Sequence, residues 1–302
     1  MAAAAITILD GGLGRQLQMI GAPFRQPEWS ALALIEAPDK VAQAHEQFAK
    51  AGAQVISTNS YAVVPFHIGD DRFRDQGHTL ADLAGRVARG VADRYGIKVS
   101  GSLPPPMGSY RPDLFDADLA RSILSTLIEA LSPHIDLWQA ETLSTLAEAQ
   151  LVAELLGDDP RPRWFSFTLE DELNASGGAV LRSGESITDA AKLAQARGVS
   201  ALLFNCSYPE VMAAAVAEAK IALGDSGIRI GVYANGFGPP PEGYAANEAV
   251  RDIRVDLDPE RYLVWAEKWV AAGATIVGGC CGIGPDHIAA LARELSIAKA
   301  DS

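Results

Sequence analysis

The sequence predicts a (β/α)8 barrel, the TIM-barrel architecture of the α/β class, formed as a single domain over residues 1–302. Short apolar runs bounded by turn residues alternate with longer amphipathic stretches along the whole chain. Strands that are buried on both faces of a parallel sheet have this continuous apolar character. A doubly wound open sheet is the alternative, but no Gly-x-Gly-x-x-Gly or Walker loop follows an early strand, so nothing favours nucleotide binding.

The strand predictions depend on runs of Val, Ile, Leu and aromatic residues that are four to eight residues long. Each run ends at Gly, Asp, Asn, Ser or another residue typical of a turn. The predicted strands, in chain order, are residues 6–9, 55–60, 98–103, 135–141, 163–169, 201–206, 229–234 and 275–278.

A predicted helix follows each of these strands, and helix-capping residues support several of them. Asp258-Pro259 places an acidic N-cap before a proline at the first helical position. Ser186 with Asp189 is typical of a capping box, and Gly198 and Gly273 stand where left-handed C-caps would end two helices. The predicted helices are residues 38–51, 77–95, 117–132, 144–157, 186–197, 209–223, 259–271 and 285–300, and the proline-rich stretches 104–106 and 239–241 are predicted loops at the carboxyl ends of strands.

Charge and cysteine content restrict the class of partner. The formal net charge of −13 disfavours a nucleic-acid backbone or an anionic membrane surface as the partner. Three cysteines in a chain of this length exclude a disulfide scaffold and indicate a reducing compartment. The first residues lack the basic region of a signal peptide, and no run of about 18 apolar residues is present. We therefore expect a cytoplasmic protein that acts on small molecules; no feature defines its oligomeric state.

All three cysteines fall at the carboxyl ends of predicted strands, which meet at one rim of a barrel. Three thiolates suit zinc and leave a fourth position open, as catalytic zinc sites do. Cys280 and Cys281 can reach one metal together with Cys206 only if the backbone turns sharply, which the flanking glycines permit. The alternative is that each cysteine is a small buried hydrophobe, and it stays open because no Cys-x-x-Cys or His-x-x-x-His spacing is present.

Two acidic residues share the same rim. Asp10 and Glu141 each lie at the end of a predicted strand, where a carboxylate can bind an ammonium group, act as a general base or cap a helix. Aromatic residues of nearby loops could hold a cation against their faces or simply pack. These aromatic residues are Trp29, Tyr61, Tyr110 and Trp138.

Together the rim motifs resemble the homocysteine S-methyltransferase family over residues 9–288. The most specific motif is Gly-Gly-Cys-Cys-Gly at 278–282, with Pro285, His287 and Ile288 after it. The other motifs are Asp-Gly-Gly-Leu-Gly at 10–14, Thr-Asn-Ser-Tyr at 58–61, Glu-Thr at 141–142 and Asn-Cys at 205–206.

The resemblance implies a zinc-bearing barrel with no catalytic residue beyond the zinc site. Its zinc ligands correspond to Cys206, Cys280 and Cys281. The residues that it implies for substrate binding are Asp10 and Glu141 at the amino group of homocysteine, the backbone of Gly11 and Gly12, and Asn235 near the open zinc position.

The reaction implied is methyl transfer from a small cationic donor to the thiolate of homocysteine, giving methionine. S-methylmethionine is the favoured donor because we expect no folate- or cobalamin-binding domain in this chain. A betaine-type donor, a zinc-thiolate subunit of a corrinoid methyl-transfer system without its own turnover, and a metal-free lyase or isomerase that uses Asp10 and Glu141 are alternatives. A related thiol or selenol could replace homocysteine. The segments 101–110 and 233–237 depart from the pattern of many members, and both belong to the rim expected to meet the donor.

Overall fold

The fold is built on eight strands, and the boundaries of two of them match the sequence prediction at both ends. In the computed structural model, which describes residues 5–238 and 253–296, Lys98–Leu103 and Arg229–Ala234 are strands as predicted. The others start or end one to three residues away from the predicted bounds. The strands are β1 (Thr7–Ile8), β2 (Val55–Ser57), β3 (Lys98–Leu103), β4 (Leu137–Leu143), β5 (Arg163–Phe167), β6 (Ala201–Asn205), β7 (Arg229–Ala234) and β8 (Ile276–Gly279).

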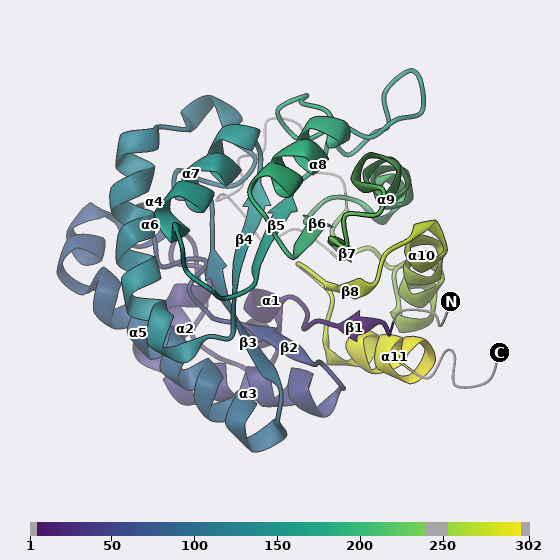
Figure 1. Ribbon diagram of the computed structural model, residues 1–302. Coiled ribbons are helices and arrows are strands. Elements are labelled where there is room, and N and C mark those ends of the chain that lie inside the picture. The colour runs from purple at the N-terminus through teal and green to yellow at the C-terminus, as the bar shows by residue number, and fades with distance from the viewer. Residues whose placement is uncertain (1–4, 239–252, 297–302) are drawn as a thin grey trace.

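All the neighbouring strands pair in parallel, in the order β1-β8-β7-β6-β5-β4-β3-β2. The two ends of this order meet at a parallel bridge between Leu9 and Val55, beside which the Asp10 amide donates to the Val55 carbonyl over 3.0 Å. Helices surround the strands on the outside (Figure 1). The (β/α)8 barrel predicted from the sequence is thereby confirmed.

The helices follow the predicted alternation, with three additional helices before α5 (Asp70–Tyr95). The predicted helix 77–95 begins at Asp70, because Gly77 packs against Phe73 inside the helix and does not start it. None of the described helices is long and apolar enough to cross a membrane. The predicted loop at 239–241 and the end of the last predicted helix lie outside the described residues. The helices are α1 (Leu13–Met19), α2 (Ser30–Glu36), α3 (Pro38–Lys50), α4 (Pro65–Ile68), α5 (Asp70–Tyr95), α6 (Ala117–Leu131), α7 (Leu146–Leu156), α8 (Ile187–Ala196), α9 (Pro209–Leu223), α10 (Pro259–Ala272) and α11 (Pro285–Leu295), with short 3-10 turns at Pro112–Leu114 and Ser132–His134.

The predicted caps hold α8 and α10 at their starts. The Ser186 hydroxyl accepts from the Asp189 amide over 3.0 Å, and Asp258 accepts from the Arg261 amide over 2.9 Å. Each side-chain oxygen satisfies one of the amides that a helix start leaves without a partner. Gly198 and Gly273 follow these helices with positive φ, as expected for C-caps.

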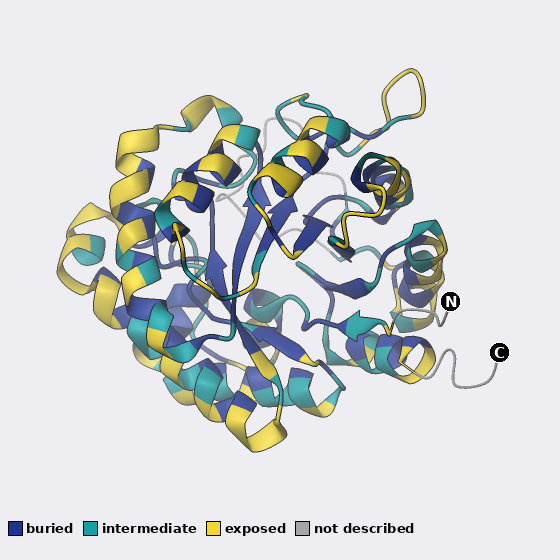
Figure 2. Cartoon of the chain, viewed as in Figure 1, coloured by how far each residue is buried: buried dark blue, intermediate teal, exposed yellow. Residues whose placement is uncertain are grey.

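Side chains from alternate strand positions fill the barrel interior, and the others pack between the sheet and the helices. Most strand residues are buried, with exposed or partly exposed residues such as Lys98 only at strand ends, whereas the helices expose their outer faces (Figure 2). The interior changes character along the barrel axis: at its amino-terminal end it is apolar, with Leu137, Ala201 and Ile276. Two or four residues further along their strands it becomes polar, with Gln139 and Asn205. A polar layer under the carboxyl-terminal rim provides the floor of the site.

Candidate active site

A cavity opens at the carboxyl-terminal end of the barrel, where the predicted rim residues meet. Its wall includes Asp10, Glu141 and all three cysteines. It also includes Gln139 and Tyr233, two strand residues that the sequence analysis did not single out. The loop-borne aromatic residues of the wall are Trp29, Tyr61, Tyr110 and Phe237. Trp138, expected near the rim from the sequence, is fully buried and lies under the guanidinium of Arg161.

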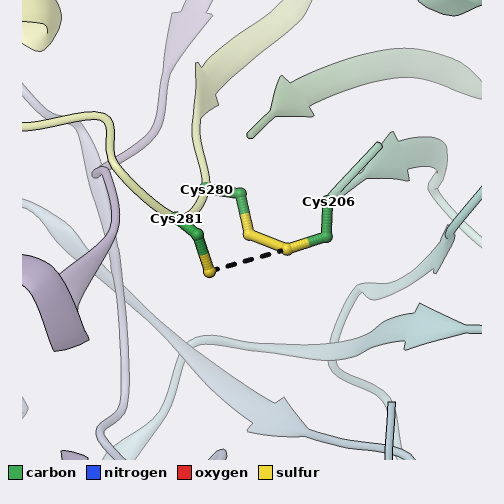
Figure 3. Close-up of side chains that lie close together, drawn as sticks. All are labelled: Cys206, Cys280 and Cys281. Carbon is green, nitrogen blue, oxygen red and sulfur yellow. Dashed lines mark hydrogen bonds between the residues drawn. A yellow bond between two sulfur atoms is a disulfide. The ribbon is translucent and has the colours of Figure 1, made fainter. Parts of the chain in front are cut away.

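The three cysteines form one sulfur cluster on the cavity wall (Figure 3). Their Sγ atoms all lie within 4.8 Å of one another. Cys206 and Cys280 are joined in a disulfide, and the Sγ atom of Cys281 lies 3.9 Å from that of Cys206. The structure thus brings together, from the residues directly after β6 and β8, the three sulfurs that the sequence places on one rim.

The backbone turns sharply at Cys280 and Cys281, as the neighbouring glycines led us to expect. The Ile283 amide donates to the Cys280 carbonyl over 3.1 Å, which closes a turn, and Gly282 adopts a φ of 83°. Gly12 lies directly against this turn, since a Cβ atom on Gly12 would come within 2.5 Å of the Cys280 carbonyl oxygen. Gly11 is restricted in the same way by the Ile283 carbonyl, at 2.3 Å. The Gly-Gly pair is therefore required by close backbone approach.

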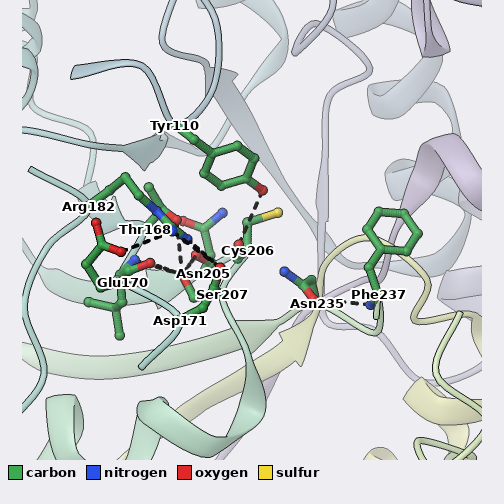
Figure 4. A network of polar contacts seen from close by, with 11 residues as sticks. Tyr110, Thr168, Glu170, Asp171, Arg182, Asn205, Cys206, Ser207, Asn235 and Phe237 are labelled. Carbon is green, nitrogen blue, oxygen red and sulfur yellow. Dashed lines mark hydrogen bonds and ion pairs between the residues drawn. The ribbon is translucent and has the colours of Figure 1, made fainter. Parts of the chain in front are cut away.

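Cys206 is held through its backbone as well as its side chain. Its amide donates to the Tyr233 carbonyl over 3.2 Å, and its carbonyl accepts from the Tyr110 hydroxyl over 3.2 Å. The guanidinium of Arg182 lies 5.2 Å from the centre of the Tyr110 ring and pairs with Glu170 at 3.5 Å (Figure 4). This network fixes the aromatic wall to the backbone of the sulfur cluster.

The two predicted acids are buried in the wall of this cavity. Ser57 donates to Asp10 from its amide, over 2.8 Å, and from its hydroxyl, over 3.3 Å. Burial and the nearby charge of Glu141 raise the pKa of Asp10 to about 8. Burial also raises the pKa of Glu141. Every side chain that is hydrogen-bonded to these carboxylates is neutral, so among the residues described neither acid is paired with a protein cation.

Glu141 owes its direction to an irregularity in β4. The pairing register between β4 and β5 shifts between Ala140 and Leu143, which is the mark of a β-bulge. In a regular strand, Glu141 and Thr142 would point to opposite faces. Both line the cavity here, which the bulge permits. Because bulges re-aim side chains, this one is the local reason that a strand acid reaches the site.

Neutral donors surround the Glu141 carboxylate. The Ser102 hydroxyl donates to Oε1, and the Tyr233 hydroxyl donates to Oε2 over 3.2 Å. Gln139 Nε2 donates to the Tyr233 hydroxyl over 2.8 Å, while Gln139 Oε1 is buried with no hydrogen-bond partner in the described part of the chain. The sequence signal that could have revealed this network is the pair of polar residues two positions apart, Gln139 and Glu141, in an otherwise apolar strand.

Backbone strain is concentrated on the cavity wall. Among the described residues, four that are not glycine have positive φ, and all four line the cavity. Left-handed conformations are unfavourable for bulky or β-branched side chains and persist only where the surrounding contacts enforce them. These residues are Trp29 (50°), Tyr110 (63°), Thr142 (59°) and Cys206 (52°).

Asn235 is the predicted site residue that the structure places behind the wall. It is buried, and its Oδ1 accepts from the Phe237 amide over 3.2 Å. Phe237 is among the residues that line the cavity and Asn235 is not; Figure 4 shows the bond that joins the two residues. Asn235 therefore fixes the loop that carries an aromatic wall residue.

The sulfur cluster fits the predicted metal on condition that its disulfide is reduced. Zinc–thiolate bonds of about 2.3 Å place two sulfurs of a tetrahedral site about 3.8 Å apart. The observed separation between Cys206 and Cys281 is 3.9 Å. Only a thiolate is a ligand, so the two sulfurs of the disulfide become available after reduction.

The fold and site define a (β/α)8-barrel protein whose rim cavity combines a sulfur cluster with a buried acid pair. The chain belongs to the homocysteine S-methyltransferase family, whose family model matches residues 7–295. This membership places it among the methyltransferases.

Similar proteins support this assignment over almost the whole chain. Homocysteine S-methyltransferase 1 of Brassica oleracea var. italica is 29% identical and covers 95% of this chain and 93% of its own length. The metallated form of the homocysteine methyltransferase MmuM from Escherichia coli has a TM-score of 0.77 at 27% identity and covers 96% of both chains. The oxidized form of the same enzyme has a TM-score of 0.76 at 27% identity and covers 95% of this chain and 94% of that one.

Proposed function

We propose that this protein transfers a methyl group from a small cationic donor, S-methylmethionine, to the thiol of homocysteine, giving methionine. The main observation that supports this proposal is the composition of one cavity. It contains two buried carboxylates without a cationic partner and three sulfur atoms within 4.8 Å of one another. An amino acid that bears a thiol has an ammonium group for the carboxylates and a sulfur atom for the cluster. Homocysteine therefore matches both parts of the cavity.

The acid pair is proposed to bind the ammonium group of the acceptor. Asp10 and Glu141 contact only neutral side chains, and Gln139 Oε1 adds a buried acceptor that has no donor in the described structure. An ammonium group has three donors and one positive charge, so it would satisfy these acceptors and favour the ionised carboxylates. The partly buried Gly11 and Gly12 line the same cavity.

The cysteines Cys206, Cys280 and Cys281, once reduced, are proposed to hold a zinc ion. When bound, zinc would lower the pKa of the acceptor thiol, about 8.5 for a free thiol, so that the thiolate prevails at neutral pH. Because the ligand set requires thiolates, we place the working protein in a reducing, cytoplasmic compartment.

The transfer itself requires no protein nucleophile. The acceptor sulfur forms a bond to the methyl carbon while the bond from that carbon to the donor sulfur breaks, and the electron pair stays on the donor sulfur. The sulfonium becomes a neutral thioether, and the thiol proton goes to solvent. The wall residues Trp29, Tyr110 and Phe237 offer aromatic faces that favour a cationic donor. The protein's role is to bind and orient the two reactants.

Turnover by the isolated protein tests the proposal. Reduced, zinc-loaded protein is given homocysteine with S-methylmethionine, betaine or S-adenosylmethionine that carries a labelled methyl group, and labelled methionine is measured by mass spectrometry. We expect about one zinc per chain and the fastest turnover with S-methylmethionine. Cys281→Ala is expected to lose both zinc and activity, and a folded, fully active Cys281→Ala protein contradicts the proposal.

The same assay separates the alternatives. Faster turnover with betaine would identify a betaine-type enzyme. Stoichiometric zinc with no turnover on any small donor would favour a subunit of a corrinoid methyl-transfer system. A reduced protein that binds no zinc would leave a metal-free lyase or isomerase that uses Asp10 and Glu141.

A further inference from the structure

The side chain of Asn205 connects the acid pair to the sulfur cluster. It is fully buried at the end of β6. Its Oδ1 accepts from the Thr142 amide over 3.0 Å and from the Ser166 hydroxyl over 2.8 Å, and its Nδ2 donates to the Thr142 hydroxyl over 2.8 Å. The side chain of Asn205 thus binds both the backbone amide and the side-chain hydroxyl of Thr142 on β4.

Thr142 is a position where such support is needed. It adopts a φ of 59°, a strained conformation for a β-branched residue, and it lies in the bulge of β4 directly after Glu141. The carboxamide of Asn205 satisfies its amide in place of a regular sheet partner. Because Glu141 and Thr142 are consecutive, the contact that fixes the Thr142 backbone also fixes the direction of the Glu141 side chain.

On its other side, Asn205 precedes Cys206 in the chain. Cys206 also has a left-handed backbone, with a φ of 52°, and its carbonyl is held by Tyr110 (Figure 4). The buried side chain of Asn205 therefore fixes the end of β4 that directs Glu141. The backbone of Asn205 leads directly into Cys206 of the sulfur cluster. The separation between these two parts of the cavity depends on this contact.

We propose that Asn205 is a positioning residue that selects the acceptor by the length of its carbon chain. This inference depends on the proposed function, in which one acceptor molecule places its ammonium at Glu141 and its sulfur at the cluster. Cysteine is one methylene shorter than homocysteine and cannot reach both ends equally well. Discrimination by one methylene is typically about 10- to 200-fold, and a 1 Å misplacement in an active site can cost about 100-fold in rate.

Two substitutions weaken the contact to different degrees. Asn205→Ser is too short to reach Thr142, whereas Thr142→Val removes only the bond from Asn205 Nδ2 and keeps the side-chain shape. Thr168→Val is the control, because the hydroxyl of Thr168 bonds to that of Ser207 over 3.0 Å and so joins the ends of β5 and β6, whereas the Asn205–Thr142 contact joins the ends of β6 and β4. The experiment measures kcat/KM for homocysteine and for cysteine with S-methylmethionine, together with zinc content. Amide hydrogen exchange of the peptide that spans residues 139–144 provides a readout that does not depend on activity.

The expected result is a fall of at least tenfold in the homocysteine-to-cysteine ratio for Asn205→Ser, a smaller fall for Thr142→Val, and no change for Thr168→Val. Amide exchange in segment 139–144 should accelerate in the same order while zinc content is retained. An unchanged ratio in folded Asn205→Ser and Thr142→Val proteins, or an equal fall in Thr168→Val, overturns the inference alone. A wild-type protein that does not methylate homocysteine overturns the proposed function and this inference together.

Discussion

The hydroxyl of Tyr233 on β7 donates a hydrogen bond of 3.2 Å to Oε2 of Glu141 on β4. The bond crosses the barrel interior and stabilises the carboxylate that we propose to bind the acceptor's ammonium. Tyr233→Phe removes one donor to a charged group, a loss that typically corresponds to about 1.5–3 kcal/mol. We expect KM for homocysteine to rise by about tenfold or more, with a smaller change in kcat. Steady-state kinetics check this, and Tyr95→Phe at the surface of α5 should behave as wild type.

Gly12 is expected to tolerate no side chain because it lies against the Cys280–Cys281 turn. A Cβ atom there would come within 2.5 Å of the Cys280 carbonyl oxygen and 3.1 Å of the Cys281 Cα atom. Gly12→Ala should therefore displace the turn and lower zinc affinity by at least tenfold. Gly90→Ala is the control, because that position in α5 has no neighbour within 4 Å of an added Cβ atom. It should leave zinc binding unchanged and stabilise the helix by about 0.5–1 kcal/mol. Equal zinc affinity in both variants would refute the argument.

Ionisation of the buried Asp10 carboxyl group is expected to lower the stability of the unliganded protein as the pH rises. Its pKa is about 8 in the fold, compared with an ordinary value of 3.8. Between these values the folded state binds more protons than the unfolded state, so stability falls with increasing pH through that window. Asp10→Asn removes this loss and is expected to raise the melting temperature, more at pH 8 than at pH 5, while homocysteine binding is lost. Thermal unfolding at both pH values tests it, and a decrease at pH 8 would contradict the prediction.

His45 on α3 is expected to limit stability in acid. It is completely buried, neither ring nitrogen has a partner in the described structure, and burial lowers its pKa from 6.5 to about 4. The unfolded state therefore binds more protons than the folded state in this window, and stability falls as the pH drops through it. His45→Leu should flatten the dependence of the unfolding free energy on pH between 7 and 4.5. Urea titrations of both proteins measure this, and parallel curves below pH 6 would show that His45 has no such effect.

The strand–helix alternation was predictable because burial selects for a simple pattern. Arg229–Ala234 is apolar on both faces after its first residue, and that pattern defines the strand. Lys98–Leu103 has only Val99 and Leu103 among Ser and Gly residues, and the turn residues on either side of it add to that signal. The missed helix α1 contains Gly14, which disfavours a helix in isolation. That glycine is required by packing, because a Cβ atom there would lie 2.6 Å from Nε1 of Trp29. Tertiary contact overrides local preference at this position.

The predicted site residues were those whose chemistry is evident at a strand end, namely the cysteines and the two acids. Gln139 and Tyr233 were not predicted, and Asn205 was identified only as part of the Asn-Cys motif, because their roles depend on pairings across the barrel between residues 63 to 94 positions apart. The bulge that turns Glu141 into the cavity could not be predicted from the local sequence either, because Glu-Thr in an apolar strand does not indicate a shift in the pairing register. Such features arise only when the barrel closes.

The seam between β1 and β2 makes Asp10 part of the closure as well as part of the cavity wall. Its amide bonds to Val55 across the seam, and its carboxylate bonds to Ser57 two residues further along β2. A ligand that binds the Asp10 carboxylate would therefore also stabilise the contact between β1 and β2 that closes the barrel. In the function that we propose, the acceptor's ammonium binds Asp10, so a bound acceptor would also stabilise the contact that closes the barrel.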